Sequence, residues 1–158
     1  MPSEGDIAPD VTLQMGDGSE TNLCALGKPL VLYFYPKDDT SGCTVEAKDF
    51  SALIDAFAQA GVGLLGVSKN SPRDHAKFIA KHDLRVPLAT DADGTVTEAF
   101  GTWIEKSLYG RKYMGIERAT FLIGADGRIA KAWRKVSVKG HAEVVLAAAR
   151  ALAGTQAA

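Results

Sequence analysis

One cysteine of this sequence stands where a thiol can do chemistry. Cys43 lies in "YFYPKDDTSGCTVEAKDF" (33–50), after an apolar stretch that ends at Pro36 and at the start of an amphipathic stretch. In the first turn of a helix, a thiol faces free N–H groups and the positive end of the helix dipole, which both favour the thiolate. Because the thiolate is the nucleophilic form, the position allows Cys43 to attack an electrophilic substrate.

Two observations oppose a reactive Cys43. Most free cysteines are buried and serve as small hydrophobic side chains. In addition, the neighbouring acids Asp38, Asp39 and Glu46 disfavour a thiolate, because like charges repel. A cation from elsewhere in the chain would have to outweigh them. The residues alone leave both the reactive and the structural role open.

Other motifs do not predict a cofactor or a metal. "GVGLLG" (61–66) has the spacing of a dinucleotide-binding loop, but it follows a predicted helix and precedes a predicted strand, the reverse of the required order. His75 and His82 share a helix face but lie ~10.5 Å apart along its axis, too far to share one metal ion. No C-x-x-C pair is present, because Glu46 stands three residues after Cys43. We therefore expect no cofactor and no metal.

The composition predicts a single soluble domain over residues 1–158, with a frayed tail at about 154–158. The chain has 158 residues, 46% of them apolar, and a formal net charge of −1, which gives no reason to expect nucleic acid or a membrane as partner. No apolar stretch reaches the ~20 residues of a membrane span, and the start has no apolar segment typical of a secretory signal. Two cysteines make no disulfide framework, so we expect a reducing cytoplasmic location. No exposed apolar stretch demands a partner, so a monomer is expected.

Around Cys43, the pattern predicts buried strands that alternate with helices. An apolar, β-rich stretch over 29–35 predicts a strand covered on both faces. Apolar residues at helical spacing predict a helix over 44–60, and Ser71 with Pro72 predicts the start of a helix that ends near His82. Further strands are predicted over 62–68 and 86–91, one or two helical turns over 94–101, and a last helix over 141–152.

Hairpins are predicted near both ends of the chain. They join 10–15 to 20–25 through Asp17-Gly18, fold 107–115 around Gly110, and join the strands of 118–135 through Asp126-Gly127. Together these elements predict an α/β domain with a central mixed β-sheet flanked by helices and an N-terminal β-hairpin. In such sheets functional residues tend to lie beyond the carboxyl ends of strands, which is where Cys43 is predicted to lie.

The chain resembles the peroxiredoxins, in particular the peroxiredoxin Q (bacterioferritin co-migratory protein) subfamily. Pro36, Thr40 and Cys43 match the signature Pro-x-x-x-Thr-x-x-Cys, and the flanks "YFYPKDDTSGCT" and "EKSLYGRKYMGIERATFLIGADGRI" are similar to that subfamily. The likeness extends from "GDIAPDVTL" to the last helix. It implies a thioredoxin-like fold with Cys43 as the peroxidatic cysteine. It also implies the missing cation, because Arg118 in "GIERATF" matches the active-site arginine of the family.

The resemblance implies a role for each of these residues in a thiol-dependent peroxidase. Cys43 would attack a peroxide oxygen while Arg118 stabilises the developing charge. Thr40 would donate a hydrogen bond to the peroxide and accept one from it, and Pro36 would line the substrate pocket and exclude water. Glu46 would orient the arginine. The implied substrates are hydrogen peroxide and small organic hydroperoxides.

The sequence departs from the subfamily at the recycling step. Many members carry a resolving cysteine five residues after the first, where this chain has Lys48, and others carry it in the next helix, which has none here. We therefore expect a one-cysteine cycle in which thioredoxin, glutaredoxin or a low-molecular-weight thiol reduces the sulfenic acid of Cys43. A two-cysteine cycle with Cys24 as resolving cysteine is one alternative. A non-enzymatic thioredoxin-fold protein serving as redox sensor or holdase is another.

Overall fold

The structure is a computed structural model that describes residues 2–16, 18–23 and 27–156. Cys24 and Asp17 lie outside the described residues, so the possible resolving cysteine and the predicted turn of the first hairpin have no structural account. None of the helices that the structure describes is long and apolar enough to cross a membrane.

The centre of the fold is the apolar stretch that the sequence predicts to be covered on both faces. This strand, β3 (Leu30–Phe34), is buried at every position. It pairs in parallel with β4 (Gly63–Ser68) and antiparallel with β8 (Ala119–Ile123). Strand β3 is therefore an interior strand, and the chain that leaves its carboxyl end leads directly to Cys43.

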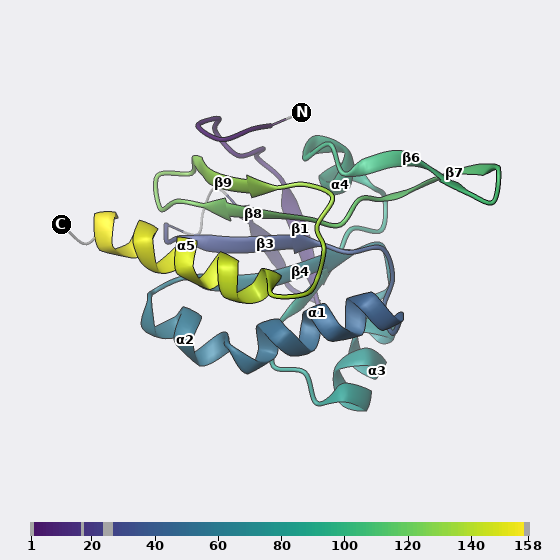
Figure 1. The fold of residues 1–158 in the computed structure, drawn as a ribbon, viewed down its shortest axis with the longest axis horizontal. Helices are drawn as coiled ribbons and strands as arrows, with labels where there is room; N and C mark the ends of the chain where they lie inside the picture. Colours follow the sequence, from purple (N-terminus) through teal and green to yellow (C-terminus); the bar gives the residue numbers. More distant parts are fainter. Residues whose placement is uncertain (1, 17, 24–26, 157–158) are drawn as a thin grey trace.

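Seven strands form one mixed sheet in the order β2-β1-β5-β4-β3-β8-β9. The other strands of this sheet are β1 (Thr12–Met15), β2 (Glu20–Asn22), β5 (Leu88–Thr90) and β9 (Ile129–Trp133). β1 and β2 form the predicted N-terminal hairpin, and β1 also pairs with β5. A separate hairpin of β6 (Trp103–Leu108) and β7 (Arg111–Ile116) projects from the body of the molecule (Figure 1). The predicted α/β fold with a mixed sheet is confirmed.

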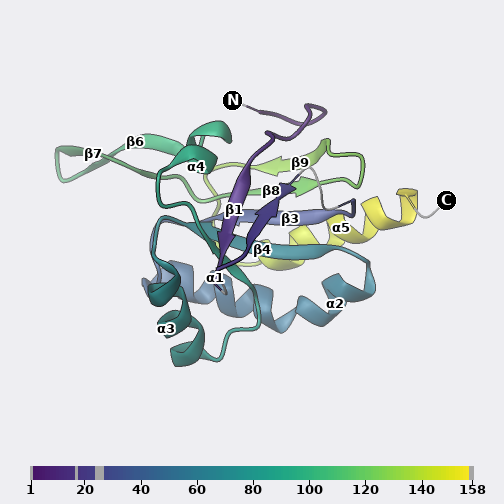
Figure 2. The same ribbon diagram turned by 180° about the vertical axis from the view of Figure 1, so that it is seen from behind.

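Helices cover both faces of the sheet (Figures 1 and 2). On one face, side chains of four helices pack against Val31, Tyr33 and Tyr35 of the central strand and its exit. On the other face, one short helix and the N-terminal segment pack against the alternate residues Leu30 and Phe34. The four helices are α1 (Ser41–Ala52), α2 (Ile54–Gln59), α3 (Pro72–His82) and α5 (His141–Gln156), and the short one is α4 (Thr95–Ala99).

Two helices differ from the predicted ranges. The single helix predicted over 44–60 is two helices, separated at Leu53, whose φ of −101° and ψ of 4° depart from helical geometry. The last helix continues past its predicted end at 152 to Gln156, into the segment predicted to be frayed. Residues 157 and 158 lie outside the described part of the chain.

Candidate active site

The structure places Cys43 in the first turn of α1, as predicted. Helix α1 begins at Ser41, and Thr40 is its N-cap residue with extended backbone geometry. Cys43 is 2% exposed. The thiol therefore lies at the positive end of the helix dipole while being shielded from water.

Arg118 contacts Cys43 directly. Its Nη2 donates a hydrogen bond to Cys43 Sγ at 3.1 Å, and its Nη1 donates to Glu46 Oε1 at 2.6 Å. Although burial acts to lower the pKa of Arg118, the charges of Glu46 and Cys43 raise it overall. The two terminal nitrogens of one guanidinium thus bond two side chains of α1. Arg118 is the cation from a distant part of the chain that is needed to outweigh the acids around Cys43.

The chain around Arg118 is fixed by its neighbours. Arg118 stands between β7 and β8, and its carbonyl accepts a hydrogen bond from Val136 N at 3.0 Å. The adjacent Glu117 is 7% exposed and pairs with Arg134 Nε at 2.5 Å, while Arg134 Nη2 donates to Gly101 O at 2.7 Å. These bonds limit how far the arginine can move from the sulfur.

Gly42 is a site residue whose role the sequence did not indicate. A Cβ atom at this position would lie 3.3 Å from Arg118 Nη2, closer than most carbon contacts. A side chain at position 42 would therefore require the guanidinium to shift by a few tenths of an ångström from its place beside Cys43. No spacing rule reveals this role, because Arg118 approaches from a distant part of the chain.

The acids predicted to oppose a thiolate each have a basic partner. The pairs are Asp38 with His75, Asp39 with Lys81 and His82, and Glu46 with Arg118. An acid whose charge is compensated by a partner repels a thiolate less than an unpaired one. These acids therefore oppose a thiolate at Cys43 less than the sequence alone suggests.

Thr40 has one hydrogen to donate, and the structure shows where it goes. Its Oγ1 donates to Lys37 O at 3.0 Å and makes no capping bond to the helix. With that hydrogen in use, the oxygen is left to accept a hydrogen bond from a ligand. Pro36 is half-buried where the chain leaves β3, four residues before Thr40. The accepting role predicted for Thr40 is compatible with this bond, whereas the predicted donating role requires the hydroxyl to turn away from Lys37 O.

Lys106 is a second cation near this site that the sequence did not single out. It lies on β6, and a Cβ atom on Gly115 of the paired strand would be 3.3 Å from its Cδ. Burial, followed by the charge of Arg118, lowers the pKa of Lys106, and the Cys43 sulfur acts in the opposite direction. Lys106 is therefore a half-buried cation on the hairpin whose charge interacts with those of Arg118 and Cys43.

Two ionisable side chains near the site, Tyr33 and His141, are buried and neutral. Tyr33 is 0% exposed, and its ring stacks on Phe50 with centroids 4.7 Å apart. Burial, with the nearby Glu46 and Cys43 charges, raises the pKa of Tyr33 and keeps it neutral. Burial and the Arg118 charge lower the pKa of His141 to about 4, so it too is neutral at pH 7. Within the described residues, no group of three His, Cys, Asp or Glu side chains could hold a metal ion.

Glu46 gives the site a testable pH dependence. Burial raises its pKa to about 7 from an ordinary value of 4.5, although the Arg118 charge and hydrogen bond act to lower it. The folded protein therefore binds a proton more tightly than the unfolded chain, and this stabilisation is complete below pH 4.5 and is lost as the pH rises to about 7. We expect the free energy of unfolding of the natural protein to fall over this window, relative to Glu46→Gln, by on the order of 1–3 kcal/mol.

Urea unfolding at pH 5 and pH 8 measures this difference. The matched control is Glu20→Gln, which changes an exposed glutamate on β2 and should leave the pH dependence as it is. Equal pH dependence in the natural protein and in Glu46→Gln would show that Glu46 has no raised pKa.

Comparisons with known proteins agree with this geometry. A family model described as AhpC/TSA matches residues 5–132. Peroxiredoxin Bcp of Xanthomonas campestris is 48% identical over 143 residues, which cover 90% of this chain and 89% of that protein.

Solved structures show the same similarity. One is the bacterioferritin comigratory protein of X. campestris, solved as a trapped intermediate/ligand complex in work on its alkyl peroxide reduction activity. It matches with a TM-score of 0.87 and 44% identity, over 97% of this chain and 98% of that one. A cysteine-to-serine variant of Xylella fastidiosa PrxQ matches with a TM-score of 0.89 and 39% identity over 96% and 97%.

Proposed function

We propose a one-cysteine peroxidase cycle for this chain, which belongs to the AhpC/TSA family and is a peroxiredoxin of the Bcp/PrxQ subfamily. Peroxiredoxins are thiol-dependent peroxidases, so the chain is an oxidoreductase with a thioredoxin-like fold. The observation that supports Cys43 as the attacking thiol is the 3.1 Å contact between Arg118 Nη2 and Cys43 Sγ in the first turn of α1.

In the proposed first step, the Cys43 thiolate attacks one oxygen of the peroxide. A sulfur–oxygen bond forms as the oxygen–oxygen bond breaks, so sulfur loses two electrons and the peroxide gains them. The second oxygen leaves as hydroxide or alkoxide and is protonated to water or alcohol, and Cys43 becomes a sulfenic acid. Arg118 and the first N–H groups of α1 stabilise the charge that is shared between sulfur and the two oxygens. Thr40 Oγ1 accepts a hydrogen bond from the peroxide, and Pro36 excludes water.

For substrates we propose hydrogen peroxide and small organic hydroperoxides. Alkyl peroxide reduction is described for the X. campestris relative, which is similar to this chain over nearly its full length. The proposed reductant is an external thiol: thioredoxin, glutaredoxin or a low-molecular-weight thiol. We also propose that the protein works as a cytoplasmic monomer.

The choice of a one-cysteine cycle rests on the missing resolving cysteine. Lys48 occupies one subfamily position for it, and α3 contains no cysteine. Leu23 and Gly27, which flank the segment that holds Cys24, border a hollow with Leu30, the first residue of β3. Cys43 follows the other end of β3, and a strand of about five residues spans ~17 Å. The two ends of β3 are thus farther apart than the ~7 Å between Cα atoms that a disulfide needs, and on this ground we propose an external reductant.

Peroxide treatment separates the alternatives. We expect one equivalent of hydrogen peroxide to give a Cys43 sulfenic acid that reacts with dimedone, while Cys24 remains open to alkylation. Intact and peptide mass spectrometry measures both modifications. A Cys24–Cys43 disulfide formed in high yield within one chain, and lost in Cys24→Ser together with thioredoxin-dependent turnover, would establish the two-cysteine cycle instead. Consumption of stoichiometric peroxide no faster than by free cysteine would favour the redox sensor or holdase.

A further inference from the structure

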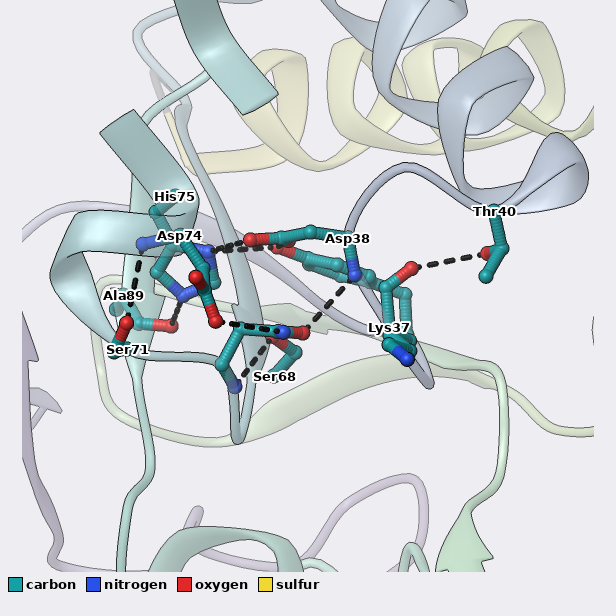
Figure 3. Close-up of polar contacts among 10 residues, drawn as sticks. Lys37, Asp38, Thr40, Ser68, Ser71, Asp74, His75 and Ala89 are labelled. Carbon is teal, nitrogen blue, oxygen red and sulfur yellow. Dashed lines mark hydrogen bonds and ion pairs between the residues drawn. The ribbon is translucent and has the colours of Figure 1, made fainter. Parts of the chain in front are cut away.

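The loop that leads to Cys43 is tied to α3 by a buried polar cluster that the proposed reaction does not use (Figure 3). Tyr35 Oη donates to Asp38 Oδ1 at 2.5 Å, and His75 Nδ1 donates to Asp38 Oδ2 at 2.7 Å. The three side chains come from the exit of β3, the loop and α3. Tyr35 and His75 are 1% exposed and Asp38 9%, so the cluster is shielded from water.

The hydrogen bonds of His75 hold both of its ring nitrogens. Its Nδ1 faces the carboxylate of Asp38, and its Nε2 lies 3.0 Å from the carbonyl oxygen of Ala89. Each ring nitrogen thus has one polar partner, and the side chain bridges the loop and β5. When protonated, His75 is also the ion-pair partner of the buried Asp38 carboxyl group. A buried charge that loses such a partner is strongly destabilised.

The backbone of Asp38 is held as well. Its N–H donates to Asn70 Oδ1 at 3.0 Å, and Asn70 Oδ1 also accepts a hydrogen bond from Ser68 Oγ at 3.1 Å. The peptide unit that contains this N–H also contains the carbonyl of Lys37. That carbonyl accepts the hydroxyl hydrogen of Thr40 at 3.0 Å. A continuous chain of bonds therefore joins His75 and Asn70 to the Thr40 hydroxyl.

Packing alone does not fix this loop against α3. A hollow of about 370 Å³ lies between them, lined on the loop side by Lys37, Asp38 and Asp39. Asp39 has a φ of 62°, a left-handed conformation, and its ion pairs lie near the surface. Exposed ion pairs contribute little stability. The buried bonds of Asp38 are thus the stronger connection between the loop and α3.

We propose that Asp38 and His75 are positioning residues for peroxide reduction. Together with Asn70, they fix the Lys37–Asp38 peptide so that its carbonyl keeps the hydroxyl hydrogen of Thr40. The oxygen of Thr40 is then available only as an acceptor, and it accepts a hydrogen bond from the peroxide. None of the three positioning side chains touches the substrate. The proposal rests on the proposed peroxidase function.

The test compares two reactions of the same thiol. Reaction with stoichiometric hydrogen peroxide requires Thr40 in place, whereas alkylation by iodoacetamide requires only an accessible thiolate. In Asp38→Asn we expect the rate constant with peroxide to fall about tenfold or more, while the alkylation rate stays within about twofold. Asn70→Ala removes the acceptor of the Asp38 N–H without leaving an unpaired buried charge, so it serves if Asp38→Asn fails to fold. It should show the same selective loss.

A double-mutant cycle tests the route through Thr40. In a Thr40→Val background the carbonyl of Lys37 has no hydroxyl to orient, so Asp38→Asn should cost little further peroxide reactivity. The matched control is Asp39→Asn, which changes the neighbouring acid on the loop and should keep both rates within about twofold. Circular dichroism and thermal unfolding verify the fold of each variant.

Three results would overturn the proposal, and they are distinguishable. Equal losses in peroxide and alkylation rates would assign the cluster a purely structural role. Unchanged peroxide rates in Asp38→Asn and Asn70→Ala, with a fast natural protein, would show that the cluster does not position Thr40. A natural protein that reacts with peroxide no faster than free cysteine would instead refute the proposed function on which the positioning role depends.

Discussion

Cys43→Ser is expected to abolish peroxide reduction and to leave the fold intact. Serine is nearly the same size as cysteine, so it fits the buried position in the first turn of α1 without a cavity. Its hydroxyl does not form the sulfenic acid through which peroxide is reduced. We expect a peroxide consumption rate indistinguishable from buffer, with an unchanged circular dichroism spectrum. Stopped-flow mixing with stoichiometric hydrogen peroxide measures the rate.

The matched control is the same exchange at the other cysteine. In a one-cysteine cycle, Cys24→Ser should retain both the fast first oxidation and turnover with an external thiol. Residual turnover near the natural rate in Cys43→Ser would exclude Cys43 as the peroxidatic residue. It would direct attention to Cys24, the only other thiol in the sequence.

Features that depend on neighbours in the sequence were predictable. Ser71 caps α3 by accepting a hydrogen bond from Asp74 N at 3.1 Å, as expected of a serine just before a proline at the first helical position. The hairpin of β6 and β7 turns around Gly110, whose φ is 78°. Glycine adopts such an angle at little cost, which is why it marks the turn.

Other features depend on packing that local pattern does not reveal. Apolar residues continue at helical spacing through the break at Leu53, because Phe50 and Phe57 on either side pack into the same cluster. The pattern therefore predicted one helix where there are two. The final helix continues past Leu152 to Gln156 although Gly154 is a poor helix former, so local pattern does not reveal this continuation.

The site is the part that the residues alone could not provide. Arg118 and Cys43 are 75 positions apart in sequence, and only the resemblance to peroxiredoxins brought them together. His75 and Asp38 are 37 positions apart, and the sequence showed His75 only as half of an unsuitable metal pair. The first contact arises because the start of β8 pairs antiparallel with the carboxyl end of β3, and the second because the parallel strands β3 and β4 place their carboxyl ends side by side. Spacing within one element carries no information about them.

Arg118→Met is expected to slow peroxide attack by roughly a hundredfold or more, the effect of removing one donor that stabilises a developing anion. Methionine keeps much of the side-chain volume but loses the hydrogen bond to Cys43 Sγ and the charge beside it. Because a nearby positive charge favours the thiolate, the pH–rate profile of Arg118→Met should also shift to higher pH than that of the natural protein. Rates with hydrogen peroxide from pH 5 to pH 9 measure both effects.

One further variant separates the contribution of the charge from that of the guanidinium geometry, and a second serves as a control. Arg118→Lys keeps a cation but lacks the planar guanidinium whose two terminal nitrogens bond Cys43 and Glu46 at the same time. Its rate should therefore lie between those of the natural protein and Arg118→Met. Arg111→Met removes an exposed arginine from the hairpin and should leave the pH profile unchanged. If Arg118→Met itself gave the natural profile, the guanidinium would have no part in the reaction, and the 3.1 Å contact would be only structural. A loss of rate as large in Arg118→Lys as in Arg118→Met would show that the planar geometry of the guanidinium, and not the positive charge alone, activates the thiol.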